Sequence, residues 1–307
     1  MTAIRTFPAA LAASAALLLP AAGRAGHFGH HGHGANVTMN DSGDPVRCDQ
    51  IDVSFGSGRR DAARAEDRTV IAPGREPLRI VAARNSGVRV RGADRSDFEV
   101  LLCKAAPSPD QLAAIRLDAS NGELTVLGPS DDQWVGYLLV QAPRGAALDV
   151  EARNGPIGLS GLSGTVSARA ENGPISIRDS TGDVRAEAQN GPIHVRGDSG
   201  HVTVRTQNGP IGVALTGSSW SGDGLDARAV NGPIHLNIPE GYASAGVVES
   251  LGRSPWHCRG SACAAARRGD DDDRRSMEFG AGTPVIHLAT ENGPVSIATG
   301  KDDDEED

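Results

Sequence analysis

Four histidines near the N-terminus are the first candidates for chemistry. His27, His30, His31 and His33 stand in a glycine-rich stretch. Imidazole nitrogens at such spacing can bind copper, nickel or zinc. The alternative is a low-complexity segment that binds nothing, because no surrounding structure fixes a coordination geometry. We therefore expect a metal site of modest affinity at most.

The four cysteines are the second chemical group. Cys48 with Cys103 and Cys258 with Cys263 is the pairing that proximity in the sequence favours, although four cysteines allow three pairings. A zinc site is the alternative, but no pair shows the Cys-x-x-Cys spacing typical of structural zinc. An even number of cysteines in an exported chain favours two disulfide bonds.

No acidic or histidine residues form a recognisable catalytic set. The acidic runs at 270–273 and 302–307 lack the alternating spacing and turn glycine of a calcium loop. His194 and His235 share an outward position in the repeat described below, but small residues alternate with them. Polysaccharide-cleaving β-helices need converging charged groups and aromatic platforms, whereas only 3% of this chain is aromatic. The sequence predicts no enzyme, no catalytic residue and no cofactor.

An apolar N-terminal segment predicts export. Arg5 precedes an apolar run over 7–22, and Gly23-Arg24-Ala25 provides a small-x-small cleavage site. The run is too short for a membrane anchor. We expect a signal peptide over 1–25 and a mature protein in the periplasm or outside the cell, with no stable membrane insertion.

The charge of the chain excludes one class of partner. The formal charge is −9, and removal of Arg5 and Arg24 with the signal peptide leaves −11. Nucleic acid and anionic lipid bind basic surfaces, so a mildly acidic body argues against both.

A repeated Asn-Gly-Pro-Ile/Val motif must position the remaining groups. Its first three spacings are 18 residues each, followed by 23 and 61. Related turns at Asn85-Ser86-Gly87 and Asn121-Gly122 lie 36 residues apart, which is twice that period. A fixed period of roughly 20 indicates stacked rungs that bury their apolar faces against each other. The motif begins at Asn154, Asn172, Asn190, Asn208, Asn231 and Asn292.

The residues around each Asn predict two short strands per rung. Positions six and four before the Asn, and three and five after it, are apolar in every copy, so they face inward. Asn and Gly tolerate positive φ, and Pro fixes its own φ where the next strand begins, so the motif itself is structural. Stacked Asn side chains can also hydrogen-bond from rung to rung. The outward position three before the Asn alternates in charge through Glu151, Arg169, Glu187, Arg205 and Arg228.

The expected fold is therefore all-β, a single elongated β-solenoid of 18-residue rungs with stacked parallel sheets. An antiparallel β-sandwich is the alternative, because Asn-Gly is also a hairpin signal. The expected organisation is a signal peptide over 1–25, a His/Gly-rich flexible segment over 26–45, the solenoid over 46–300 with an insertion at 242–285, and an acidic tail over 301–307.

One segment carries a family resemblance. Tyr137-Leu138-Leu139-Val140-Gln141-Ala142-Pro143-Arg144-Gly145, followed by Leu148-Asp149-Val150 and the Asn-Gly-Pro-Ile rungs, resembles the bacterial putative-adhesin family. Leu236-Asn237-Ile238-Pro239-Glu240-Gly241 is similar to a second copy of its Pro-x-Gly turn. The resemblance covers about residues 78–300 and implies a domain of unknown function with β-strand repeats and no shared catalytic residues. The insertion at 242–285 departs from the pattern.

The function expected from these features is an exported, non-enzymatic structural and interaction module of the cell envelope, resembling an adhesin. Its partner would be an envelope or cell-surface protein or glycan. A periplasmic sensing or scaffold protein that binds metal weakly through the His-rich tail is the alternative. A polysaccharide-active enzyme ranks third. Handedness, oligomeric state and the partner itself stay open.

Overall fold

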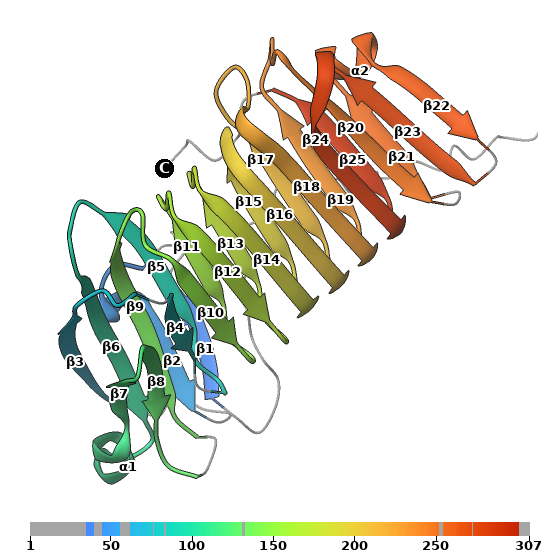
Figure 1. The fold of residues 1–307 in the computed structure, drawn as a ribbon. Helices are drawn as coiled ribbons and strands as arrows, with labels where there is room; N and C mark the ends of the chain where they lie inside the picture. The colour runs from blue at the N-terminus through green and yellow to red at the C-terminus, as the bar shows by residue number, and fades with distance from the viewer. Residues whose placement is uncertain are drawn as a thin grey trace, which may run out of the picture.

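A computed structural model describes residues 35–39, 45–55, 62–75, 77–82, 84–130, 133–251, 254–271 and 273–300. Its strands form a two-stranded, a 12-stranded and an 11-stranded sheet. The two large sheets lie face to face along one elongated body (Figure 1). Over the described residues, no helix has the length and apolar character needed to cross a membrane.

The repeat forms the middle of both large sheets, as the sequence predicts. Strands that precede the motif Asn pair in parallel in the 12-stranded sheet, and strands that follow it pair in parallel in the 11-stranded sheet. Equivalent residues of successive motifs stand opposite each other, as Val184 does between Val166 and Val202. The prediction of stacked parallel sheets is confirmed. The first set is β10 Leu148–Ala152, β12 Thr165–Ala170, β14 Asp183–Asn190, β16 Ser199–Asn208, β18 Ser221–Asn231 and β24 Ala281–Asn292, and the second is β11 Ile157–Ser160, β13 Ile175–Arg178, β15 Ile193–Gly197, β17 Ile211–Leu215, β19 Ile234–Ile238 and β25 Val295–Thr299.

The core lies between these two sheets. The four inward columns of the rungs that start at Leu148 are almost fully buried, and the most exposed member, Val195, has only 4% of its surface accessible. Burial of one Val, Leu or Ile side chain stabilises a fold by about 1.5–3 kcal/mol. Each rung therefore depends on its neighbours, since the side chains of adjacent rungs complete its core.

The motif corner is held by an asparagine ladder. Asn172 Nδ2 donates to Asn154 Oδ1 at 3.1 Å, and the same bond joins each later Asn to the preceding one at 2.9–3.1 Å. Asn154 donates in turn to Asn85 Oδ1 at 3.4 Å. Each side-chain amide from Asn154 to Asn231 therefore gives and receives a hydrogen bond along the stack, and Asn292 donates at its end.

The motif glycines are needed for a different reason from the one the sequence suggests. None of them lies among the described residues with positive φ. A β-carbon at Gly173, Gly191 or Gly209 would instead lie 2.2 Å from the carbonyl oxygen of the glycine one rung earlier. The backbones of successive corners approach so closely that any side chain would overlap the neighbouring rung.

The N-terminal end adds strands out of sequence order. The rung of β4 Leu78–Val81 and β5 Val88–Ala93 lies between β10–β11 and the strands β8 Glu123–Leu127 and β9 Val135–Pro143. Antiparallel strands then extend each sheet outward. These are β7 Arg116–Ser120, beside β8, and β6 Phe98–Ala106 with β3 Ala63–Ile71, beside β9, with helix α1 Pro109–Ala114 between β6 and β7.

One expected rung corner is wrong. Asn121 and Gly122 have φ of 52° and 76°, and they join the antiparallel strands β7 and β8 as a tight hairpin. Positive φ at both central residues is the backbone of a type I′ hairpin turn. If Asn121 were a rung corner, Leu124 would lie in the 11-stranded sheet, like the other residues three positions after a motif Asn. It stands instead opposite Ile80 in the 12-stranded sheet.

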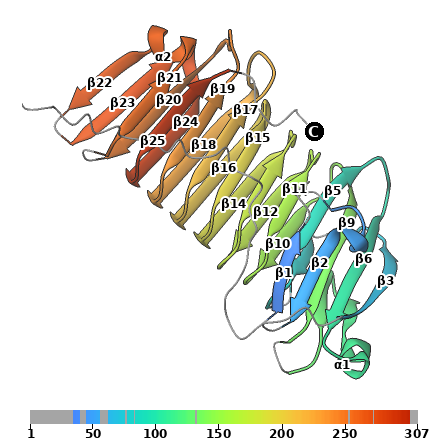
Figure 2. The ribbon, with the colours of Figure 1, turned by 180° about the vertical axis from the view of Figure 1, so that it is seen from behind.

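A second apolar cluster covers the outside of this end. Strands β1 Ala35–Met39 and β2 Ile51–Phe55 form the two-stranded antiparallel sheet, and they lie across β6 and β9 (Figure 2). Ile51, Val53 and Phe55 pack against outward residues of those strands, including Tyr137. A 3-10 turn over Cys48–Gln50 precedes β2, and the Cys48–Cys103 disulfide joins this turn to β6.

The C-terminal end repeats the same arrangement. Strands β20 Ser244–Leu251 and β21 Trp256–Arg259 come earlier in the sequence than β24 and β25 but lie further out in the two sheets. The rung β24–β25 therefore lies between them and β18–β19. The residues 242–285 thus extend both sheets by a further rung. Strands β23 Arg274–Phe279 and β22 Arg267–Asp271 add antiparallel pairs at the edge, and helix α2 Ser261–Ala265 carries Cys263.

Candidate functional site

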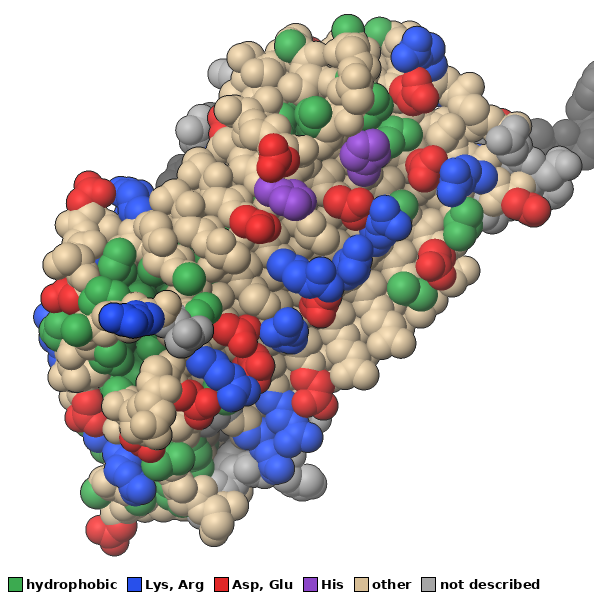
Figure 3. All heavy atoms as spheres, in the orientation of Figure 1, with side chains coloured by type: hydrophobic (Ala, Val, Ile, Leu, Met, Phe, Trp, Pro, Cys, Tyr) green, Lys and Arg blue, Asp and Glu red, His purple; other side chains and the backbone are tan. Residues whose placement is uncertain are grey.

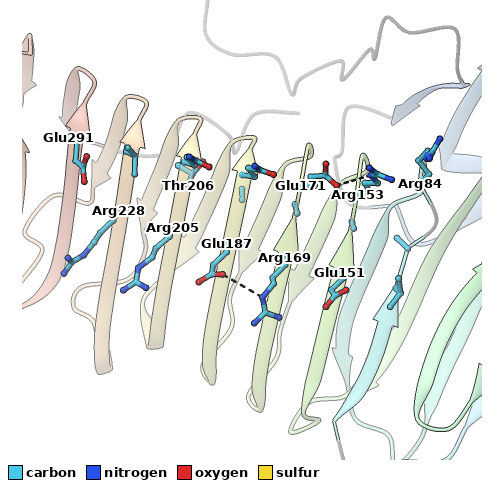
Figure 4. A pocket seen from close by; sticks show the side chains of 18 residues that line it. Arg84, Glu151, Arg153, Arg169, Glu171, Glu187, Arg205, Thr206, Arg228 and Glu291 are labelled. Carbon is cyan, nitrogen blue, oxygen red and sulfur yellow. Dashed lines mark hydrogen bonds and ion pairs between the residues drawn. The ribbon is translucent and has the colours of Figure 1, made fainter.

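A groove of about 1060 Å³ crosses the outer face of the 12-stranded sheet beside the motif corners. Its side chains come from successive strands between β4 and β24, so it runs perpendicular to the strands. Small residues two positions before the Asn, such as Ala170 and Ala188, line it together with charged residues one and three positions before the Asn. Figure 4 shows Glu151, Arg169, Glu187, Arg205 and Arg228 in one row across successive strands.

The strand period explains this charged lining. Successive residues of a strand point to opposite faces, so the positions one and three before the Asn both face outward. The parallel register then repeats each position on the next rung, about 4.8 Å away. Charged side chains of both signs are interspersed over the surface seen in Figure 3.

Ion pairs satisfy most of the charges in the groove. Arg153 Nε lies 3.0 Å from Glu171 Oε2, and Arg169 Nη1 lies 3.1 Å from Asp149 Oδ1. Arg169 also approaches Glu187 at 3.8 Å. All of these side chains are partly exposed, so each pair contributes little to stability, about 0–1 kcal/mol.

Arg205 departs from this pattern. It stands between Glu187 and Arg228 in the register, and Glu187 is already engaged by Arg169 and Arg185. Within the described part of the chain, Arg205 forms no ion pair or hydrogen bond through its side chain. Arg228 pairs with Asp226 at 2.9 Å, and this hydrogen bond raises the pKa of Arg228 above its ordinary value. The alternation of charge expected for this column thus ends in two adjacent arginines.

The residues singled out in the sequence are distributed over separate regions. His27, His30, His31 and His33 and the acidic run at 302–307 lie outside the described residues. Cys48 pairs with Cys103, and Cys258 with Cys263. Asp270 forms an ion pair with Arg275 at 3.4 Å. The six motif Asn residues form the ladder at the corner, where they border the groove.

The outward column of the 11-stranded sheet holds a feature that the sequence showed only in part. His194 and His235 are two rungs apart, with Gly212 between them, as the repeat predicts. His257 joins the same column through Ser296, and nothing in the motif alignment could place it, because it belongs to the segment 242–285. Partial desolvation by the surrounding chain lowers the pKa of His194, although the residue is exposed, and nearby positive charge on Arg178 lowers it further.

The groove residues one position before each Asn were missed by sequence reasoning. Arg153 and Glu171 occupy equivalent positions in consecutive repeats, and a column-by-column alignment of outward positions would have found them. Across the described ranges, no three or more His, Cys, Asp and Glu side chains are grouped closely enough to hold a metal ion.

Comparison with known protein families and with curated proteins finds no match. Several solved structures are similar at low identity. A putative cell adhesion protein from Clostridium sporogenes is 11% identical, covering 77% of this chain and 100% of its own, with a TM-score of 0.28. A putative adhesin from Parabacteroides distasonis is 7% identical, covering 77% and 98%, with a TM-score of 0.32. A putative lipid binding protein from the same species is 7% identical, covering 78% and 97%, with a TM-score of 0.28. Likeness at this level carries no conclusion about function.

Proposed function

We propose that this chain is an exported, non-enzymatic binding module of the cell envelope, which holds a protein or glycan partner against the outer face of its 12-stranded sheet. The observation that carries the proposal is the groove beside the motif corners, where charged side chains repeat at the fixed spacing of the rungs. The two disulfides support export, because such bonds persist in oxidising compartments.

The rigidity of the stack supports a binding role. Groove residues project from strands whose neighbours on both sides are hydrogen-bonded, so their backbone loses little freedom when a partner binds. Arg205 is available for a new ion pair, whereas Arg153 and Arg169 must exchange existing ones. The partner would therefore place acidic groups near Arg205 and polar groups elsewhere along the groove.

Affinity capture from envelope extract tests the proposal, with the mature chain and an Arg205→Glu/Arg228→Glu variant as parallel baits. The expected result is a partner retained by the native chain and lost by the variant, since reversal of two charges repels acidic groups. Arg267→Glu at the far edge strand is the matched control and should retain the partner. Equal retention by both baits would place binding outside the groove. Turnover of envelope glycans by the purified chain would contradict the non-enzymatic part.

A further inference from the structure

Histidines recur at every second rung on the outer face of the 11-stranded sheet. Strand register places His194 beside Gly212, Gly212 beside His235, His235 beside Ser296, and Ser296 beside His257. All three histidines are exposed. The column thus alternates between an imidazole and a small residue, on the opposite side of the molecule from the charged groove.

His194 leans toward His235 over the intervening glycine. A β-carbon at Gly212 would lie 2.8 Å from Nδ1 of His194 and 3.4 Å from its Cε1. Adjacent strands are about 4.8 Å apart, so the ring has crossed roughly one strand spacing and lies above the strand that separates the two histidines. The missing side chain at position 212 gives the His194 ring room above β17, on the side of the column where His235 follows.

We propose that His194 and His235 form a two-histidine site for a divalent transition-metal ion above Gly212. Imidazole nitrogens suit Zn²⁺, Cu²⁺ and Ni²⁺, and Zn²⁺ accepts an incomplete set of protein ligands when water fills the remaining positions. A metal ion requires neutral imidazole.

The neighbourhood limits the strength of such a site. In the described chain no group of three or more metal-ligating side chains occurs, so water must supply the other ligands. The positive charge of Arg178 also disfavours a cation. We therefore expect a weak, open site that takes up metal reversibly. Ser296 carries a side chain between His235 and His257, so the site belongs to the first pair.

Zinc titration of the full chain tests this site in a background that removes the N-terminal histidines. His27, His30, His31 and His33 are replaced by Ala in every variant, and Zn²⁺ binding is followed by isothermal titration calorimetry. Loss of one bound equivalent is expected on His194→Ala and on His235→Ala. Gly212→Ala keeps both ligands but pushes the His194 ring aside, and it should weaken that equivalent by about tenfold or more. The matched control, His257→Ala, should leave it unchanged.

Several outcomes would overturn the proposal. Absence of zinc binding in the background chain, or retention of the equivalent in a His194→Ala/His235→Ala double variant, shows that the pair holds no metal. Loss of the equivalent on His257→Ala moves the site elsewhere in the column. An unchanged affinity in Gly212→Ala contradicts the geometry. Circular dichroism of each variant separates these outcomes from unfolding, and none of them bears on the charged groove.

Discussion

At the scale of single residues, the difference between inward and outward positions decides the effect of a substitution. Ile193 is fully buried between rungs, whereas Arg205 lies on the exposed face. Ile193→Asp buries an unpaired charge and should prevent folding, while Arg205→Ala should cost under about 1 kcal/mol. Urea unfolding of both variants measures this difference, and similar losses would contradict the assignment of faces.

The motif glycines give a second test at this scale. Gly191→Ala places a methyl group 2.2 Å from the Gly173 carbonyl oxygen, and the displaced backbone should lower the free energy of unfolding by about 1–3 kcal/mol. Gly145 has no atom within 4 Å of the equivalent position, so Gly145→Ala is the control and should be close to neutral. Thermal denaturation compares the two. Equal melting temperatures would show that the corners have room for a side chain.

Tyr242 links stability to alkaline pH. Burial, followed by the charge of Asp198, raises the pKa of its phenol to about 12, above the ordinary value. A raised pKa in the folded state means that its contribution is complete below about pH 10 and is lost as pH rises toward 12. Tyr242→Phe should therefore flatten the decline in unfolding free energy between those pH values. A decline identical to that of the native chain would show that Tyr242 has no part in it.

At the scale of the elements, the two disulfides stabilise different amounts of chain. Cys48 and Cys103 are 55 residues apart, and Cys258 and Cys263 are five apart. Loop-closure entropy predicts about 4 kcal/mol for the first bond and about 2 for the second. Cys48→Ser/Cys103→Ser should accordingly lower the urea midpoint further than Cys258→Ser/Cys263→Ser. The reverse order would mean that the short bond maintains packing at the C-terminal end.

Each pair of strands also depends on its position in the stack. The rung β4–β5 lies between β8–β9 and β10–β11, and the rung β24–β25 lies between β18–β19 and β20–β21. In both cases the order in the sheets differs from the order in the sequence. Both insertions place a regular rung inside and an irregular set of strands outside. The regular repeat is thereby shielded at each end by antiparallel strands whose side chains need not match the motif.

At the scale of the whole molecule, the edge strands of the two sheets determine whether a second molecule can add its own strands to them. An open parallel edge can add another chain, and charged side chains on an edge strand oppose such pairing. The edge strand β22 carries exposed Arg267 and Arg268, and Arg267 pairs with Glu278 at 3.0 Å. The C-terminal edge of the 12-stranded sheet is therefore protected by charge.

Removal of this protection should change the state of association. Arg267→Val/Arg268→Val removes both positive charges from the edge strand and leaves Asp270 and Asp271 as its charged residues, and we expect self-association that light scattering after size-exclusion chromatography detects. Arg185→Val, on the sheet face, is the control and should elute like the native chain. An unchanged mass for the edge variant would show that the arginine charges are not what prevents another chain from pairing with this edge.

The sequence by itself determined the repeating part of this protein. Apolar columns, small corner residues and the spacing from Asn154 to Asn208 fix the register, because each rung follows the same local period and packs on a copy of itself. The tertiary structure alone decided the hairpin at Asn121, the inserted end rungs, the position of His257 and the hollow along the groove. These depend on contacts between segments far apart in the chain, and no local period records such contacts.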